Sequence, residues 1–140
     1  VSKVGAKVQG RVSEVRVRQG QRVRAGEVLL RLDEVEARAQ LAATRARALA
    51  AVARVQTARA NLAEAEAQAS RARGLAEKDV GPAAQASDLE AHAKSLGALL
   101  KAAEAEAQAA QAEVDTQKTA LNQLTVAAPI DGTVISKPPE

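Results

Sequence analysis

The chain lacks several residue types on which a compact globular protein usually depends. Its 140 residues contain no cysteine, methionine, phenylalanine, tryptophan or tyrosine, although 46% of them are hydrophobic. Without cysteine, neither disulfides nor thiolate metal sites can form, and the redox compartment stays open. Large side chains supply most of the area that a globular core buries. Because alanine dominates the apolar residues here, we expect an elongated molecule with a thin apolar seam.

Long apolar runs and a strong net charge are missing as well. No run of about eighteen apolar residues occurs, as a membrane span would need, and no signal peptide is recognisable. Since Val1 opens in the middle of a strand-like pattern, we interpret the sequence as a fragment of a longer protein. The net charge of +3 is too small to indicate a nucleic-acid partner. Residues 1–31 are basic, which favours an acidic partner or anionic surface, although a solvated charged face is commoner.

Residues 1–33 combine alternating apolar residues with glycines at turn positions. Valines and leucines alternate with charged or polar residues around Gly10, Gly20 and Gly26. Glycine suits tight turns that need a positive φ. The pattern predicts four short antiparallel strands with one polar and one apolar face.

Residues 34–125 predict two long helices. The stretches 34–78 and 83–125 consist almost entirely of residues with high helix propensity. Gly81 and Pro82 lie between them, where they favour a helix stop and a restart. Within each stretch an uncharged row recurs at alternating steps of four and three residues, which is a heptad seam. We therefore predict a coiled-coil hairpin whose tip falls at about residues 77–85.

The two seams match each other in antiparallel order. When they face each other, the position numbers of facing residues sum to 161 or 162 throughout. The only polar members, Thr44 and Gln117, then fall in one layer, and we predict that this polar layer sets the register. Oppositely charged residues also meet beside the seam. The expected pairs are Arg47 with Glu113, Arg54 with Glu106, Arg59 with Glu104, and Arg73 with Glu90.

Residues 126–140 return to a strand-like pattern around a turn at Pro129-Ile130-Asp131-Gly132. The β region is therefore split, with one half before the hairpin and the other after it. We predict an α+β fold in which a long antiparallel coiled-coil hairpin, residues 34–125, is inserted into a partial β domain. That domain comprises residues 1–33 and the start of its second half at residues 126–140.

The order of these motifs resembles that of a known family. The stretch "GRVSEVRVRQGQRVRAGEVLLRLD", a long alanine-rich hairpin and then "LTVAAPIDGTV" resemble the HlyD-like membrane fusion proteins, the periplasmic adaptors of bacterial efflux pumps and type I secretion systems. The most specific part is "AP-x-DG-x-V" after the second helix. The resemblance implies that the split β domain is biotinyl/lipoyl-like. Carrier domains of that fold present a modifiable lysine at a hairpin turn, but Leu32-Asp33-Glu34 stands there, so we expect no cofactor.

The resemblance also implies a function and partners. Such an adaptor links an inner-membrane transporter of the ABC, RND or MFS type to an outer-membrane channel protein in a tripartite efflux or secretion system. It works as a hexamer or trimer in the periplasm of a Gram-negative bacterium. Its inner-membrane anchor would lie outside this fragment.

In this family the hairpin tip docks onto the channel. Tripartite-pump members often show an Arg, a Leu four residues later and a Ser seven beyond that. Arg71 and Leu75 match the first two, while Pro82 stands at the serine position. The residues that we predict to bind the partner are Arg71, Leu75, Lys78, Asp79, Val80 and Gly81.

No catalytic or metal site is evident in the sequence. His92 is the only histidine and has no carboxylate or cysteine partners at ligand spacing. We expect no enzyme activity. Two other interpretations stay open, namely a carrier domain of a biotin- or lipoate-dependent enzyme, which the missing lysine disfavours, and a coiled-coil scaffold without a transport role. Apolar residues off the seam, Leu49, Val52 and Leu99, are either neighbour contacts in a ring of adaptors or scattered surface residues.

Overall fold

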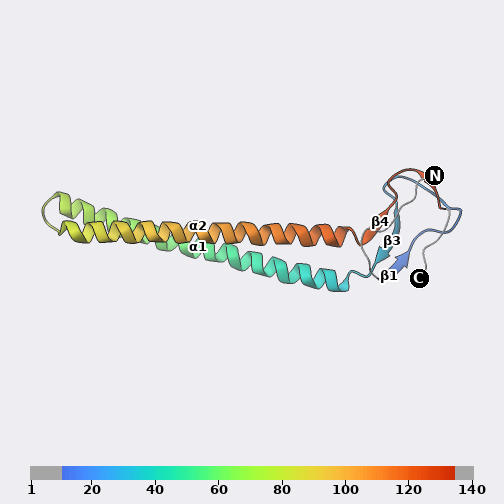
Figure 1. Ribbon diagram of the computed structural model, residues 1–140, viewed down its shortest axis with the longest axis horizontal. Helices are drawn as coiled ribbons and strands as arrows, with labels where there is room; N and C mark the ends of the chain where they lie inside the picture. Colours follow the sequence, from blue (N-terminus) through green and yellow to red (C-terminus); the bar gives the residue numbers. More distant parts are fainter. Residues whose placement is uncertain (1–10, 135–140) are drawn as a thin grey trace. The chain divides into compact units, whose positions relative to one another are not determined.

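The computed structural model describes residues 11–134. The chain divides into two compact units, each of which is described by itself. The first, here called the β unit, contains every strand of the described residues and runs to residue 43 and again from residue 115. The second, here called the arm, comprises residues 44–114. In order, the elements are β1 (Val12–Val15), β2 (Arg22–Val23), β3 (Val28–Leu32), α1 (Val35–Glu77), α2 (Ala83–Asn122), β4 (Thr125–Ala127) and β5 (Gly132–Thr133) (Figure 1).

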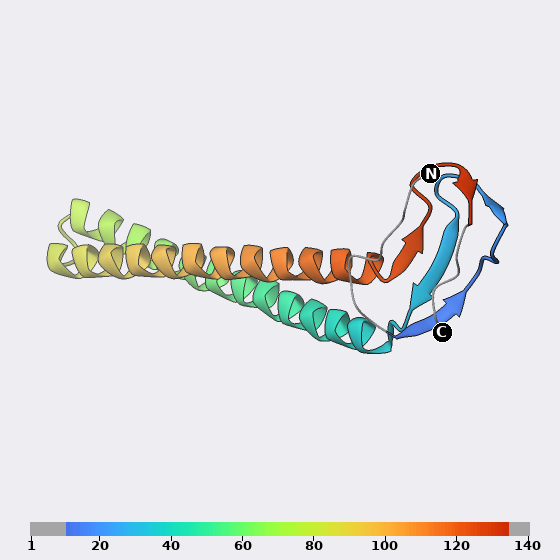
Figure 2. The ribbon, with the colours of Figure 1, turned by 45° about the vertical axis from the view of Figure 1, so that its right-hand side comes forward.

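The β unit is assembled from both sides of the helices. A three-stranded antiparallel sheet has the order β1-β3-β4, and β2 pairs with β5 in a second antiparallel ladder (Figure 2). Because β4 and β5 follow α2 in the chain, the split β domain that the sequence predicts is confirmed. Three of the four strands expected before the helices are β1, β2 and β3. The fourth would fall in residues 1–10, outside the described residues.

The core of the β unit is small and also draws on both halves. Val17, Val23 and Ala128 are buried, and Val15, Leu29 and Val134 pack against them partly buried. Core residues recur every six positions on each side of the helices: residues 17, 23 and 29 precede α1, and residues 128 and 134 follow α2. The alternation that places valines inward leaves the intervening residues outward. The core is therefore complete only when the second half is in place.

A turn occurs twice in the first half, over residues 17–21 and 23–27. Both copies read Val-Arg-x-Gly followed by Gln or Glu, and their glycines, Gly20 and Gly26, have φ of +88° and +86°. That left-handed conformation is unstrained only for glycine, which explains the residue at each position.

The second half is held by these two turns in the same way. Gly20 N–H donates to the Val134 carbonyl at 2.7 Å, and Gly26 N–H donates to the Ala128 carbonyl at 2.8 Å. The N–H groups of Val134 and Ala128 donate in return to the residues that follow the glycines, at 2.8 and 2.9 Å. Each copy of the turn thus binds one point of the returning chain through a reciprocal pair of backbone hydrogen bonds.

The helices bury the predicted seam and little else. Every seam position in α1 and α2 is buried or half-buried, and every other position in them is exposed except Gly74 and Gly97. Helix α1 lies one residue inside the predicted stretch 34–78 at each end, and α2 begins at Ala83 as predicted. The fourth end was placed too late. Helix α2 stops at Asn122 because Thr125, which was assigned to the helix, pairs with Arg31 of β3 instead.

Ion pairs across the two helices confirm the register of the hairpin. Three of the four predicted pairs form, each between α1 and α2, and the pair of Arg47 with Glu113 stays a prediction. The three are Arg54–Glu106 at 3.8 Å, Arg59–Glu104 at 3.8 Å and Arg73–Glu90 at 2.6 Å. All of these side chains are exposed, so each pair contributes at most about 1 kcal/mol and favours the register more than the stability.

Candidate partner-binding site at the hairpin tip

Helix α1 ends at the tip in a compact hydrogen-bonded turn. Val80 N–H donates to the Leu75 carbonyl at 2.9 Å, and Asp79 N–H donates to the Ala76 carbonyl at 3.1 Å. These two bonds, six-to-one and five-to-two, form a Schellman motif, which satisfies carbonyls that a helix end leaves free. Asp79 takes the left-handed position with φ of +57°, where glycine is usual. The direction of the chain at the tip is therefore fixed by backbone contacts.

Gly81 and Pro82 complete the turn and begin the second helix. Gly81 N–H also donates to the Leu75 carbonyl, at 3.2 Å, and a Cβ on Gly81 would lie 3.2 Å from Leu75 Cβ. This contact is tight enough that only glycine fits without a shift of the neighbouring residue. The Pro82 carbonyl then accepts the Ala86 N–H at 3.4 Å and starts α2. The glycine and proline have the stop and restart roles that the sequence predicted for them.

An open groove lies behind this turn, with a volume of about 320 Å³. Both helices and the turn contribute to it. The lining residues are Gln68, Arg71, Ala72, Leu75, Gly81, Pro82, Gln85 and Leu89. The groove thus combines aliphatic walls with two amide side chains and one guanidinium, a set that fits an apolar group flanked by hydrogen-bond acceptors. Just beside it, Arg73 and Glu90 join the helices through the shortest ion pair of the arm that the structure gives, at 2.6 Å.

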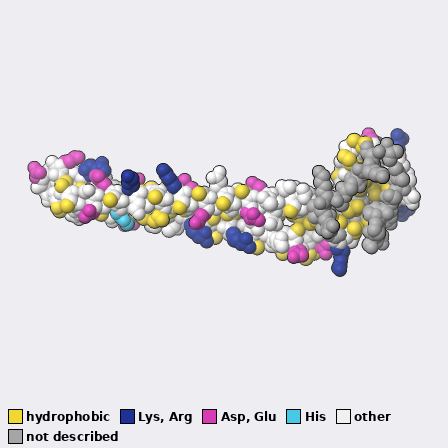
Figure 3. Space-filling view, in the orientation of Figure 1, with side chains coloured by type: hydrophobic (Ala, Val, Ile, Leu, Met, Phe, Trp, Pro, Cys, Tyr) yellow, Lys and Arg dark blue, Asp and Glu magenta, His cyan; other side chains and the backbone are white. Residues whose placement is uncertain are grey.

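The structure brings some of the predicted tip residues together and separates others. Arg71, Leu75 and Gly81 line the same groove. Val80 is 72% exposed beside it, and Leu75 is 49% exposed, so large apolar surface is open to solvent at the tip. Lys78 and Asp79 are exposed in the turn and do not line the groove. Figure 3 shows hydrophobic, acidic and basic side chains interspersed over this end of the arm.

Sequence reasoning missed part of the groove. Gln68 and Gln85 were not singled out, and Leu89 was assigned only to the seam. One available signal was the constant sum of facing positions, which already places Leu89 opposite Ala72, both of them groove residues. The glutamines carry no comparable signal, because glutamine on a helix surface is common.

A second groove of about 320 Å³ lies farther along the arm, lined by Asn61, Glu64, Ala65, Gln68, His92 and Leu96. Within residues 11–134 no group of three histidine, cysteine, aspartate or glutamate side chains is placed to hold a metal ion.

The predicted polar seam residues differ in burial. Thr44 is 4% exposed and Gln117 is half-buried, and their meeting in one layer stays a prediction.

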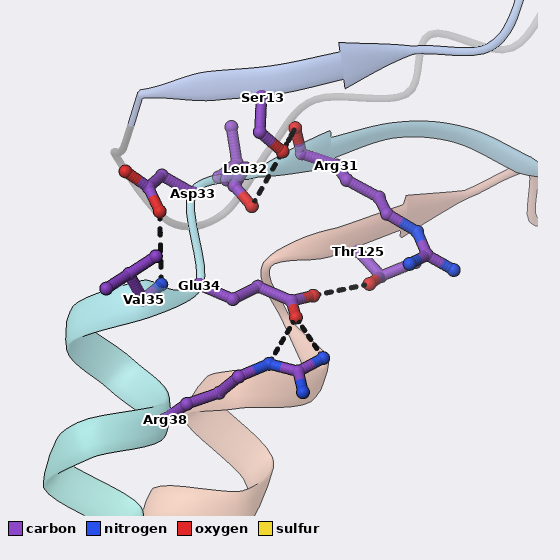
Figure 4. Close-up of polar contacts among 8 residues, drawn as sticks. All are labelled: Ser13, Arg31, Leu32, Asp33, Glu34, Val35, Arg38 and Thr125. Carbon is purple, nitrogen blue, oxygen red and sulfur yellow. Dashed lines mark hydrogen bonds and ion pairs between the residues drawn. The ribbon is translucent and has the colours of Figure 1, made fainter.

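The turn where a carrier domain would present its lysine has a different role in this chain. Asp33 Oδ1 accepts the Val35 N–H at 3.0 Å and caps α1 (Figure 4). Glu34 accepts hydrogen bonds from Arg38 Nε at 2.9 Å and Nη2 at 2.6 Å, and from the Thr125 hydroxyl at 3.4 Å. The Arg38 hydrogen bond is the main cause that lowers the pKa of the Glu34 carboxyl. Two carboxylates at this turn thus start the helix, where its dipole favours negative charge.

Comparisons with known proteins agree with this architecture. The family model for the barrel-sandwich hybrid domain of the RND membrane fusion proteins matches residues 1–138. Among curated proteins, none matches the chain in sequence.

Solved structures give the same fold. MacA from Actinobacillus actinomycetemcomitans superposes with a TM-score of 0.91 at 26% identity, covering 98% of this chain and 42% of that one. A MacA-MexA chimeric protein with the Pseudomonas aeruginosa MexA α-hairpin domain has a TM-score of 0.51 at 28% identity, covering 98% and 40%. Spr0693, a membrane fusion protein from Streptococcus pneumoniae R6, shares the fold, with a TM-score of 0.64 at 22% identity over 91% and 47%.

A β domain divided by a long helical hairpin defines a class of adaptor proteins, and the family match makes the assignment specific. The chain belongs to the RND membrane fusion protein family, the periplasmic adaptors of efflux systems. It spans about two fifths of the length of the MacA structure that it matches. In residues 11–134, neither helix has a stretch long and apolar enough to cross a membrane.

Proposed function

We propose that this chain is the hairpin-bearing part of a periplasmic adaptor that links an inner-membrane transporter to an outer-membrane channel, with the hairpin tip docking on the channel. The observation that carries the proposal is the tip groove. It places Arg71 beside the half-exposed Leu75 at a turn whose backbone is held by the Schellman motif. Family membership supports the adaptor role, and the groove supports the tip as the contact.

The tip differs from the rest of the arm in what it offers a partner. Along the arm the large exposed apolar residues occur as Leu49 and Val52 on α1 and as Leu99 on α2. At the tip, the exposed Leu75 itself lines a groove beside Val80, whereas none of the exposed apolar residues along the arm lines the tip groove or the groove farther along the arm. A buried apolar anchor with a neighbouring arginine is the usual composition of a binding hot spot. Because the turn is already ordered, docking there costs little conformational entropy.

The remaining parts of the proposal rest on the family. We place the chain in the periplasm of a Gram-negative bacterium, anchored to the inner membrane through a part of the protein other than residues 11–134. Its transporter would be of the ABC, RND or MFS type, and the assembled adaptor a hexamer or trimer. Its role would be structural and non-enzymatic. MacA and the other adaptors to which the chain is similar support this assignment.

Site-specific crosslinking tests the docking contact. These 140 residues contain no cysteine, so the single substitutions Arg71→Cys, Leu75→Cys and Val80→Cys each introduce one cysteine into this part of the protein. The parent protein without a substitution sets the background, and Thr57→Cys is the mid-arm control. In cells that carry the full-length protein, we expect adducts with an outer-membrane channel from the three tip positions and none from Thr57. If a strain shown to transport gives no channel adduct from any tip position, the scaffold interpretation replaces ours.

A further inference from the structure

The tip groove and the second groove farther along the arm are built alike. Each is lined by one seam alanine of α1 and one seam leucine of α2. The pairs are Ala72 with Leu89 at the tip and Ala65 with Leu96 in the second groove. Gln68 lines both grooves and therefore joins them. Because Ala65 and Ala72 are seven residues apart, the second groove repeats the tip groove one heptad, about 10.5 Å, farther from the tip.

The charge of the groove is inverted between the two copies. Arg71 lines the tip groove, and Glu64, seven residues before it, lines the second groove. Apart from His92, the other lining residues carry no ionisable side chain. Within residues 11–134 the structure gives no ion pair to Arg71 or Glu64. The joined grooves thus present a cation near the tip and an anion one heptad away, and both charges are left for a partner.

Both grooves lie on one edge of the hairpin, here called the open edge. Asn61 and Gln68 line it, and each directly precedes the first of the two seam residues in its heptad, a position that flanks the seam on one side. Arg59 and Arg73 directly follow the second seam residue and flank the seam on the opposite side. There they pair with glutamates of α2, at 3.8 and 2.6 Å. Over the same heptads, ion pairs therefore bridge one edge of the arm, while the grooves occupy the other.

We propose that the open edge binds an α-helix of the outer-membrane channel, which lies along both grooves. The inference rests on the proposed function and adds the form of the partner to it. One face of an α-helix presents side chains seven residues apart, which is the spacing at which the grooves repeat. Such a helix places one apolar side chain in each groove. It carries an acidic residue towards Arg71 and a basic residue towards Glu64, so the order of the two charges fixes its direction.

A helix of the channel fits this edge better than a helix of a second copy of the chain. The tip groove is the proposed channel contact, and the shared Gln68 makes the second groove its continuation. A neighbouring copy in the same orientation would turn its ion-paired edge towards the open edge. The Arg59 and Arg73 side chains of that edge already have partners, so they are not available to Glu64.

Crosslink mapping tests the form of the partner. Full-length proteins with Asn61→Cys, Gln68→Cys or Leu75→Cys, which follow the open edge in steps of seven residues, are labelled with a maleimide–benzophenone reagent and irradiated in cells. Mass spectrometry then identifies the channel residues attached at each position, with the parent protein as background. We expect successive attachment sites about seven residues apart in one segment of the channel. Glu66→Cys follows the seam residue Ala65 on the ion-paired edge and should give no channel adduct.

A charge reversal tests the order of the two charges. Glu64→Arg should weaken co-purification of the channel with the full-length protein about tenfold, because the second groove would then repel the basic residue of the helix. Glu66→Arg makes the same change of charge at an exposed position on the other edge and should alter binding less than about twofold. Glu64→Gln removes the attraction without adding repulsion and should weaken binding about threefold. Circular dichroism checks that the helices of each variant are intact.

The outcomes separate this inference from the proposed function. Channel adducts from Leu75→Cys alone, with equal binding by the Glu64→Arg and Glu66→Arg variants, would confine the contact to the tip; the inference would be overturned and the proposed function would stand. Attachment sites two residues apart would indicate an extended strand, and adducts from Asn61→Cys to a second adaptor chain alone would indicate an interface between copies. Either result overturns the inference. If no tip position gives a channel adduct, the proposed function fails and the inference fails with it.

Discussion

The β unit and the arm are stabilised by contacts of opposite kinds. In the arm, each buried residue is specified by a local heptad pattern, and the facing helix repeats that pattern in reverse order. In the β unit, two of the three ladders among the described strands, β3–β4 and β2–β5, join residues before α1 to residues after α2, and so does the core. The Gly26–Ala128 hydrogen bond, for example, spans the whole hairpin in sequence. The arm can therefore form from its own sequence, whereas the β unit requires that the two ends of the hairpin meet. A substitution that destabilises one unit should therefore affect a different part of the chain from a substitution that destabilises the other.

The largest effect is expected from a charge in the core of the β unit. Ala128 is 4% exposed and contacts the core from the returning chain, so Ala128→Asp would bury an unpaired carboxylate. We expect a loss of about 3–5 kcal/mol of folding free energy in the β unit, with the helical signal of the arm retained. Hydrogen exchange resolved by residue measures both. The neighbouring Ala127→Asp, at an exposed position, should cost less than about 1 kcal/mol. Equal loss of protection in the arm would contradict the division into two units.

The next effect concerns function at the tip. Leu75→Ser removes an exposed leucine from the groove, and Leu99→Ser removes a comparably exposed leucine, 58% against 49%, from the middle of the arm. We expect Leu75→Ser to weaken channel binding at least tenfold, about 1.4 kcal/mol, and to reduce export, while Leu99→Ser leaves both unchanged. Channel binding is measured by co-purification with the full-length protein. If both variants lose binding alike, the contact extends over the arm and is not confined to the tip.

A smaller, stabilising effect is expected in the tip turn. Asp79 occupies a left-handed position with φ of +57°, which glycine adopts without steric cost. Asp79→Gly should therefore raise the unfolding free energy of the arm by about 0.5 kcal/mol. Lys78→Gly, at the preceding residue where φ is not positive, should lower it by a similar amount. Thermal unfolding of the two variants side by side checks the difference in sign. A stabilising Lys78→Gly would show that the strain was assigned to the wrong residue.

The smallest effect concerns pH at the start of α1. The hydrogen bond from Arg38 lowers the pKa of Glu34 in the folded chain. Glu34 therefore contributes stability that is fully present above its unfolded pKa, near 4.3, and is lost as pH falls through the lower folded pKa. In Glu34→Gln we expect a shallower decline of stability below about pH 4.3, measured by denaturant unfolding at several pH values. An identical pH dependence in both chains would show that the Arg38 contact does not persist in solution.

The two units also differ in how much of them could be predicted from sequence. The seam and the ion pairs of Arg54 and Arg73 followed from the heptad period, because position along a helix decides which residues face each other. The break between the helices followed from the residue types of Gly81 and Pro82. The splitting of the β domain followed from its pattern and family resemblance. The pairing of β2 with β5 did not, because strands of two residues have no periodicity to read.

The tip groove was also beyond prediction. Arg71 and Leu75 were named through a family resemblance, but their surroundings depend on the backbone between α1 and α2. The Schellman turn brings Gly81 against Leu75, and the start of α2 then places Gln85 on the groove. No sequence rule marks Asp79 as the left-handed residue of that turn, since aspartate is usual at other helix positions. Geometry of this kind appears only once the chain is folded.

Because the position numbers of facing residues have a constant sum, each facing pair in the arm depends on the lengths of both helices. A seven-residue insertion in α1 alone would leave the helices unable to keep their facing pairs at both ends at once, so that either the pairs near Arg73 and Glu90 or those near the start of α1 would be lost. The same insertion made at facing positions in both α1 and α2 would restore each facing pair and leave the tip turn unchanged. Length in this arm is therefore adjustable, but only in paired steps of one heptad. A tip could in this way be carried on shorter or longer arms without redesign of its contacts.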